Sequence, residues 1–244
     1  MKAVILAAGV GSRLAPLTND RPKVLVEVLG RSFLFRQLDL LAQAGIPSRD
    51  VVVVGGYRLD TLKAALASGG FECEIVFNDR YEAWNNFYSP LVAESALRGC
   101  DFLQLDGDTI LDDKLLPKVL AAPGEALIAV DCRDELDDET MKVELAEGVV
   151  RAISKKLDPA RCVGEYIGVT KLTAAAAAKV FAELATFPDL GLTHEYYEHA
   201  FHRLTGGLTT ASLPFGIVDV HDCKVLEIDN VEDLRRAEEL MSGE

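Results

Sequence analysis

Short apolar runs and amphipathic stretches alternate along the first part of the chain. The apolar runs are bounded by polar or glycine-containing segments and predict strands over residues 3–8, 50–54, 73–77 and 101–105. Apolar positions with helical spacing lie between them, over residues 33–44, 58–67 and 89–98. Strands that alternate with helices predict an α/β fold, with a Rossmann-like, mostly parallel sheet and helices on both faces.

The middle of the chain has a different pattern. Residues 142–145 and 149–156 alternate between apolar and polar positions around the turn signal Glu147-Gly148, and residues 165–171 predict a further strand. The remaining predicted elements are two helices, a strand and a last helix, over residues 174–185, 195–204, 224–228 and 231–241. We expect one domain, residues 1–244, with an antiparallel flap and acceptor-binding subregion at about residues 131–215.

Composition narrows the class of protein. Of the 244 residues, 49% are hydrophobic, which is enough for a sizeable core. No stretch approaches the roughly 18 uncharged apolar residues of a membrane-spanning helix, and the first apolar run is too short for a secretory leader. The five cysteines are widely spaced and form no Cys-x-x-Cys pair, which argues against a zinc site or a disulfide framework. The expected location is therefore the cytoplasm.

Charge is unevenly distributed along the chain. The net charge of −14 argues against nucleic acid or an anionic membrane as a partner. Residues 1–31, however, carry five basic and two acidic side chains, whereas residues 101–147 carry fourteen acidic and four basic ones. A positive segment that faces a cluster of carboxylates is suited to a nucleoside triphosphate and its Mg²⁺ ion.

A glycine loop follows the first predicted strand directly, at Gly9-Val10-Gly11-Ser12. Small residues leave backbone N–H groups accessible, so a phosphate chain can lie against them; a plain structural turn explains the two glycines equally well. A dinucleotide-binding oxidoreductase is disfavoured because Leu14 stands at the third glycine position and Pro16 discourages an immediate helix. The Walker-type phosphate loop is absent as well.

The residues after the loop are more specific. Residues 6–25 match without a gap the pattern Leu-Ala-Ala-Gly-x-Gly-[Ser/Thr]-Arg-[Leu/Phe]-x-Pro-Leu-Thr followed by Pro-Lys-x-Leu. This stretch resembles the nucleotidyltransferase superfamily that activates sugar phosphates and phospho-alcohols. The whole chain is most similar to the small bacterial cytidylyltransferases that act on phosphocholine, 2-aminoethylphosphonate or inositol 1-phosphate.

The resemblance implies roles for particular residues. It makes Arg13, Lys23 and Lys155 the catalytic side chains, although a solvated lysine pair at residues 155–156 is an equal alternative on composition alone. It places the nucleotide against Leu6, Ala7, Ala8, Gly9, Gly11, Ser12, Asn85, Asn86, Ser89 and Asp106. Residues 84–89 lack the glycine-rich run of the sugar-phosphate enzymes, and amide groups there can read a pyrimidine edge.

Carboxylates that suit Mg²⁺ occur at two places. Asp106-Gly107-Asp108 ends an apolar strand, and alternation along the strand favours Asp108 as the exposed carboxylate. Glu227 and Asp229 are two residues apart and face the same side of a predicted strand. Helix capping by Asp229 or Asn230 is the alternative. With the resemblance, Asp108 and Asp229, together with Glu227, become the predicted Mg²⁺ ligands.

Aromatic and acidic side chains near the predicted flap suggest where the second substrate binds. Their grouping could hold an ammonium group through cation–π and charge contacts, although core packing of the tryptophan and an ordinary amphipathic helix face are simpler readings. The predicted acceptor-binding residues are Trp84, Glu165, Tyr196, Tyr197 and Glu198. The acidic run at residues 131–139 is interpreted as a solvated loop.

Together, these features predict a Mg²⁺-dependent enzyme that transfers a nucleotidyl group from CTP to a small phosphomonoester or phosphonate and releases pyrophosphate. A homodimer is common among the enzymes that it resembles. Two alternatives stay open: a sugar-1-phosphate nucleotidylyltransferase that uses UTP, GTP or dTTP, and a non-catalytic nucleotide-binding regulator.

Overall fold

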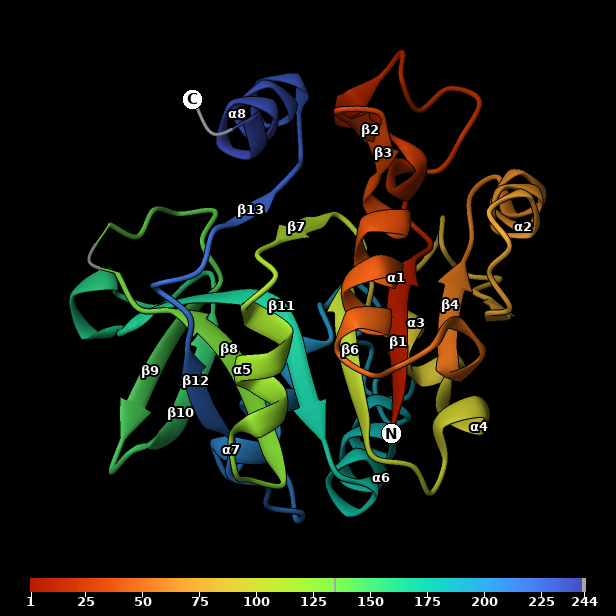
Figure 1. Ribbon diagram of the computed structural model, residues 1–244. Coiled ribbons are helices and arrows are strands. Elements are labelled where there is room, and N and C mark those ends of the chain that lie inside the picture. The colour runs from red at the N-terminus through yellow and green to blue at the C-terminus, as the bar shows by residue number, and fades with distance from the viewer. Residues whose placement is uncertain (134, 243–244) are drawn as a thin grey trace.

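The computed structural model describes residues 1–133 and 135–242, arranged around one large mixed sheet (Figure 1). Asp134 of the predicted acidic loop and the last two residues of the predicted domain lie outside this description. The parallel part of the sheet has the order β6-β1-β4-β5. Its strands are β1 (Lys2–Ala7), β4 (Val51–Gly55), β5 (Glu74–Phe77) and β6 (Phe102–Asp106).

The antiparallel part of the sheet is organised by β11 (Gly164–Leu172), which pairs with β6, β8 and β9. The register with β8 shifts between Tyr166 and Thr170, where Gly168 has a φ of 76°. β9 also pairs with β10, and β12 joins β8 in parallel. These strands are β8 (Ala126–Asp131), β9 (Lys142–Ala146), β10 (Val149–Ser154) and β12 (Gly216–Asp219).

Helices cover both faces of the sheet because successive side chains of β1 point to opposite sides. Val4 belongs to one hydrophobic cluster with residues of α3 (Tyr88–Val92), α6 (Ala174–Leu184) and α7 (Glu198–Thr205). Ala3 and Ile5 belong to a second cluster with residues of α1 (Phe33–Gln43), α2 (Leu59–Ser68) and α5 (Leu115–Ala121). Figure 1 shows α1 and α5 in front of the sheet and α6 behind it. The predicted α/β class is confirmed.

Two small sheets and the last helix complete the structure. β2 (Glu27–Val28) pairs with β3 (Arg31–Ser32), and β7 (Thr109–Leu111) pairs with β13 (Val225–Glu227). α8 (Val231–Ser242) follows β13. The β7–β13 pair places the turn after β6 beside the end of the chain, so carboxylates far apart in sequence become neighbours.

Two predicted helices differ from the observed ones. The predicted helix at residues 89–98 is divided into α3 and α4 (Glu94–Leu97), because the N–H of Ala96 bonds to Ala93, three residues earlier. The helix predicted from residue 195 begins at Glu198, since the segment before it bonds to the loop at Asn85. Among the described residues, no helix is long and apolar enough to cross a membrane.

Candidate active site

A cavity of about 370 Å³ lies at the carboxyl ends of β1 and β6, beside the register shift in β11. Ligands of open α/β sheets gather at the carboxyl ends of the strands, and the cavity lies at such a position. The predicted residues that line it are Leu6, Ala8, Gly9, Gly11, Ser12, Arg13, Lys23, Asn85, Asn86, Ser89, Asp106, Asp108, Lys155, Glu165, Tyr196, Glu198, Glu227 and Asp229. Ala7, Trp84 and Tyr197 are not among its lining residues.

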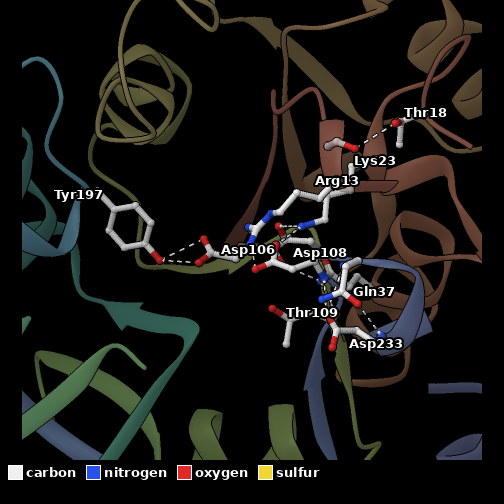
Figure 2. A network of polar contacts seen from close by, with 12 residues as sticks. Arg13, Thr18, Lys23, Gln37, Asp106, Asp108, Thr109, Tyr197 and Asp233 are labelled. Carbon is white, nitrogen blue, oxygen red and sulfur yellow. Dashed lines mark hydrogen bonds and ion pairs between the residues drawn. The ribbon is translucent and has the colours of Figure 1, made fainter. Parts of the chain in front are cut away.

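The glycine loop lies directly against the side chain of Lys23. Gly11 has a φ of 68°, and a Cβ at this position would lie 2.7 Å from the Cβ of Lys23. Both the backbone conformation and the close approach therefore require glycine. The hydroxyl of Thr18 donates to the carbonyl of Gly11 at 2.9 Å and fixes the loop from its other side. The loop and the lysine are thus built as one unit (Figure 2).

Lys23 is held by two carboxylates from distant parts of the chain. Its Nζ donates to Oδ2 of Asp108 at 2.7 Å and to Oδ1 of Asp229 at 2.8 Å. The lysine side chain is only 11% exposed, so these ion pairs are poorly screened by solvent. Burial disfavours the ammonium, but the two carboxylates outweigh it and raise the pKa of Lys23. The lysine therefore remains charged at neutral pH.

Three carboxylates meet next to this lysine. Oxygens of Asp108, Glu227 and Asp229 all lie within 4.8 Å of one another. Glu227 keeps an exposed surface, but desolvation of its carboxyl, followed by the charges of Asp108 and Asp229, raises its pKa to about 7. Burial also disfavours the charge of Asp229, but Lys23 and Arg13 outweigh it and lower its pKa. Oxygen ligands in such a cluster suit Mg²⁺, which would relieve their mutual repulsion. The three predicted ligands therefore fit this ion.

The turn that carries Asp108 is fixed from both sides. A Cβ on Gly107 would lie 2.6 Å from the carbonyl oxygen of Leu6, so only glycine fits there. On the other side, Nε2 of Gln37 donates to the carbonyls of Asp106 and Thr109, at 2.7 Å and 2.9 Å. Gln37 is buried, and its role was not predicted.

The end of β13 combines capping and charge, as the sequence alternatives suggested. Oδ1 of Asn230 accepts from the N–H groups of Glu232 and Asp233 and so caps α8. Oδ2 of Asp233 accepts from the N–H groups of Asp229 and Asn230. Asp229 therefore has no capping role in these contacts, and its carboxylate faces Lys23 and Arg13, whose Nη2 lies 2.8 Å away.

The predicted base-reading amides differ in what they can still bind. The carboxamide of Asn85 is engaged at both ends: Nδ2 donates to the carbonyl of His194 at 2.9 Å, and Oδ1 accepts from the N–H of Asn86 at 2.7 Å. Oδ1 of Asn86 accepts from the N–H of Tyr197. Ser89 is buried and accepts from Nδ2 of Asn78 at 3.0 Å. Asn85 therefore positions the loop, whereas the Nδ2 group of Asn86 is the better candidate to contact a base.

Tyr197 does not lie where the acceptor prediction puts it. Its side chain is fully buried, and its hydroxyl bonds to the two carboxylate oxygens of Asp106 at 3.0 Å and 2.9 Å (Figure 2). Burial, then the charges of Glu198 and Asp108, raise the pKa of Asp106 well above its usual value. Tyr197 therefore supports a buried carboxyl, and contact with an acceptor is not available to its ring.

Two other predicted residues also stand away from the cavity. Trp84 packs against Phe87 and Tyr88, with ring centroids 5.7 Å and 5.0 Å away, so the simpler interpretation as core packing describes it. Ala7 is buried because its side chain points into the cluster formed with α1 and α2. Neither side chain is placed to contact a substrate directly.

Lys155 and Tyr196 form the opposite wall of the cavity. Nζ of Lys155 lies 3.2 Å from Oε2 of Glu139 and 5.6 Å from the ring centroid of Tyr196. Burial disfavours the ammonium of Lys155, but its bond to Glu139 contributes to a raised pKa. The predicted site residues of the chain's two halves thus share one cavity.

The family of MobA-like NTP transferase domains matches residues 3–189 of the chain. The chain belongs to this family. It is therefore a nucleotidyltransferase.

Individual relatives agree with this assignment. The choline-phosphate cytidylyltransferase of Streptococcus pneumoniae is 27% identical over 247 residues, which cover all of both chains. The CTP:phosphoglutamine cytidylyltransferase of Campylobacter jejuni is 31% identical over 75% of this chain and 77% of its own. The solved structure of the inositol-1-phosphate CTP transferase from T. maritima has a TM-score of 0.80 at 25% identity, and the alignment covers 99% of this chain and 94% of that one.

Some residues in and around the cavity were not predicted. Glu139 belongs to the acidic run that was interpreted as a solvated loop, yet its carboxylate reaches Lys155. Gly168 lines the cavity, and a Cβ there would lie 2.7 Å from Oδ2 of Asp106. A glycine inside a predicted strand is a signal for such a close approach and could have identified it. Thr109, Met141, Tyr166 and Ile167, which also line the cavity, carry no comparable signal.

Proposed function

We propose that this nucleotidyltransferase transfers a cytidylyl group from CTP to a small phosphomonoester or phosphonate, with Mg²⁺ as its cofactor. The observation that carries this proposal is the position of Lys23, whose ammonium lies between Asp108 and Asp229 and beside the glycine loop. A fixed cation at this point suits a group that must neutralise a transferring phosphoryl centre. The names of the three relatives given above support CTP as the donor.

In the proposed reaction, an oxygen of the acceptor's phosphate or phosphonate attacks the α-phosphorus of CTP. The bond between the α-phosphorus and the oxygen that bridges to the β-phosphate breaks, and the electron pair leaves with pyrophosphate. The N–H groups at Gly9, Gly11 and Ser12 bind the phosphates, and Arg13 neutralises charge on the departing pyrophosphate. The protein contributes positioning and charge, with no covalent intermediate.

Two lysines contact the second substrate in the proposed reaction. Lys23 bridges the α-phosphate and the attacking oxygen, whereas Lys155 holds the acceptor from the opposite wall of the cavity. Asp108 and Asp229, with Glu227 beside them, would hold Mg²⁺. When bound, the ion neutralises phosphate charge at the α-phosphate. The single-domain organisation, the cytoplasmic location and the homodimer stay predictions.

A pyrophosphate-release assay tests the proposed function. CTP, UTP, GTP and dTTP are each combined with a small acceptor panel: phosphocholine, phosphoethanolamine, 2-aminoethylphosphonate, inositol 1-phosphate and glucose 1-phosphate. We expect release that requires Mg²⁺, CTP and one of the first four acceptors. Release with glucose 1-phosphate and UTP, GTP or dTTP instead would show that the protein is a sugar-1-phosphate nucleotidylyltransferase and not a cytidylyltransferase.

A further inference from the structure

Glu198 differs from the other carboxylates at the acceptor side of the cavity. Glu139 pairs with Lys155, and Glu165 pairs with Arg133. Glu198 lines the same cavity, but the residue is only 5% exposed and makes no ion pair in the described part of the chain. Its Oε2 has no hydrogen-bond partner there either. A buried carboxyl oxygen without a hydrogen-bond partner is costly whether the group is protonated or ionised, so it points to a missing polar group.

The surroundings of Glu198 define what that missing group must supply. Burial is the largest influence on its carboxyl and, with the charge of Glu227, raises the pKa of Glu198 to about 8, although a backbone hydrogen bond, the charge of Lys155 and the hydroxyl of Tyr197 act in the opposite direction. An N–H donor would satisfy Oε2, and a positive charge would make the ionised carboxylate favourable. An ammonium group of the acceptor meets both requirements at once.

The aromatic side chains argue against a quaternary ammonium group. A trimethylammonium has no N–H to donate and relies on open aromatic faces. Tyr197 is fully buried, and Trp84 packs in the core away from the cavity. The ring of Tyr196 is exposed, but Lys155 lies over it, 5.6 Å from its centroid. Tyr166 also lines the cavity, but it is only 4% exposed and its ring packs against Tyr197 and Phe201. The described residues therefore offer no set of free aromatic faces around the cavity.

We propose that the acceptor carries an ammonium group with at least one N–H, such as a primary amine on a short chain, and that Glu198 receives it. This inference rests on the proposed function because it specifies the acceptor of the same site. Lys155 then binds the phosphate or phosphonate end, and Glu198 selects the amine end. Glu198 is a specificity-determining residue in this assignment.

A methylation series tests the inference on the unmodified enzyme. Phosphoethanolamine and its N-methyl, N,N-dimethyl and N,N,N-trimethyl derivatives keep one positive charge while the number of N–H groups falls from three to none. With CTP and Mg²⁺, we expect kcat/KM to be about tenfold or more lower for the trimethyl compound than for phosphoethanolamine, because a hydrogen bond to a charged group is lost. Equal or faster turnover of the trimethyl compound would overturn the inference.

The other outcomes separate this inference from the proposed function. Turnover of inositol 1-phosphate with CTP, without turnover of any ammonium acceptor, overturns the role of Glu198 and leaves the cytidylyltransferase proposal intact. No pyrophosphate release with any donor and any acceptor overturns both.

Two variants test whether Glu198 is the source of the preference between acceptors. Glu198→Gln keeps the shape of the side chain, and we expect it to reduce the preference for phosphoethanolamine over the trimethyl compound to within about threefold, with the KM for CTP unchanged. Glu195→Gln, the matched control, alters a residue three positions earlier that does not line the cavity, and it should keep the full preference. An unchanged preference in Glu198→Gln would remove Glu198 from recognition.

Discussion

The two sides of the cavity differ in how their lysine side chains are buried and paired. The phosphate-loop side, made by residues 9–23 with Asp108 and Asp229, has one buried lysine at 2.7 Å and 2.8 Å from carboxylates of other segments. The acceptor side, made by Glu139, Lys155, Tyr196 and Glu198, pairs Lys155 with Glu139, a carboxylate that is 84% exposed. The first arrangement is preorganised and the second is adaptable. From this difference we infer that the phosphate-loop side determines the reaction and that the acceptor side determines which acceptor binds.

Replacement of the buried lysine should have the largest effect. In Lys23→Ala, the α-phosphate loses a preorganised charge and Asp108 and Asp229 lose their shared partner. We expect turnover in the pyrophosphate-release assay to fall on the order of a hundredfold or more. Lys63→Ala on the exposed surface of α2 is the control and should be unaffected. Near-normal turnover of Lys23→Ala would show that the preorganised side does not drive the reaction.

Replacement of the adaptable lysine should affect the acceptor alone. In Lys155→Ala, we expect the KM for the acceptor to rise about tenfold, because one charged contact is removed, while the KM for CTP stays within about twofold. Lys156→Ala is the matched control, since Lys156 is exposed and does not line the cavity. An equal rise in both KM values would mean that the two sides of the cavity do not act separately.

The hydroxyl of Tyr197, at the start of α7, bonds to the carboxyl of Asp106, close to the carboxylates Asp108, Glu227 and Asp229. Tyr197→Phe removes this bond and keeps the buried ring, so the free energy of unfolding in urea should fall by about 1–3 kcal/mol. The neighbouring control, Tyr196→Phe, alters an exposed ring and should change it by less than about 0.5 kcal/mol. If both variants unfold at the same urea concentration, the bond to Asp106 contributes nothing to stability.

The smallest expected effect is a pH dependence of the stabilisation by Mg²⁺. The pKa values of Glu227 and Glu198 are about 7 and about 8, whereas their ordinary value is 4.5. Between pH 4.5 and 8, the folded state therefore binds more protons than the unfolded state, and without metal these groups lower the stability as pH rises. Mg²⁺ competes with those protons, so it should raise Tm more at high pH.

Thermal unfolding at pH 5.5 and pH 8.5 measures this effect. The protein is unfolded with EDTA, with MgCl₂, or with KCl at the same ionic strength as the control. We expect Mg²⁺ to raise Tm by about 2–4 °C more at the higher pH, which corresponds to about 1 kcal/mol in a protein of this size. The same increase at both pH values would contradict a metal site that includes Glu227.

Sequence reasoning was most successful where residue spacing is tied to backbone geometry. The glycine loop and the carboxylates Asp108 and Asp229 were noticed at predicted strand ends, the family resemblance implied the roles of these residues and of Lys23, and the structure brings them together. A glycine with a φ of 68° and a turn after a strand constrain the chain locally, so their consequences can be seen in a single segment.

The acceptor side was less predictable because its contacts join distant segments. Tyr197 was expected to face the substrate, yet its ring turns to Asp106, 91 positions away in sequence. Trp84 could be read as a ligand or as core, and only packing against Phe87 and Tyr88 decides it. Glu139 is exposed, as the solvated-loop interpretation implies, but its pairing with Lys155 was not predicted because it depends on how β9 and β10 place the two segments.

The most direct test of the central claim is the identity of the bond that breaks in CTP. ³¹P NMR follows CTP, Mg²⁺ and phosphoethanolamine in the presence of the enzyme. The account predicts equal amounts of pyrophosphate and of a product in which CMP is joined to the acceptor through a new diphosphate bond. Formation of CDP and inorganic phosphate, or of free CMP without a joined product, would contradict it.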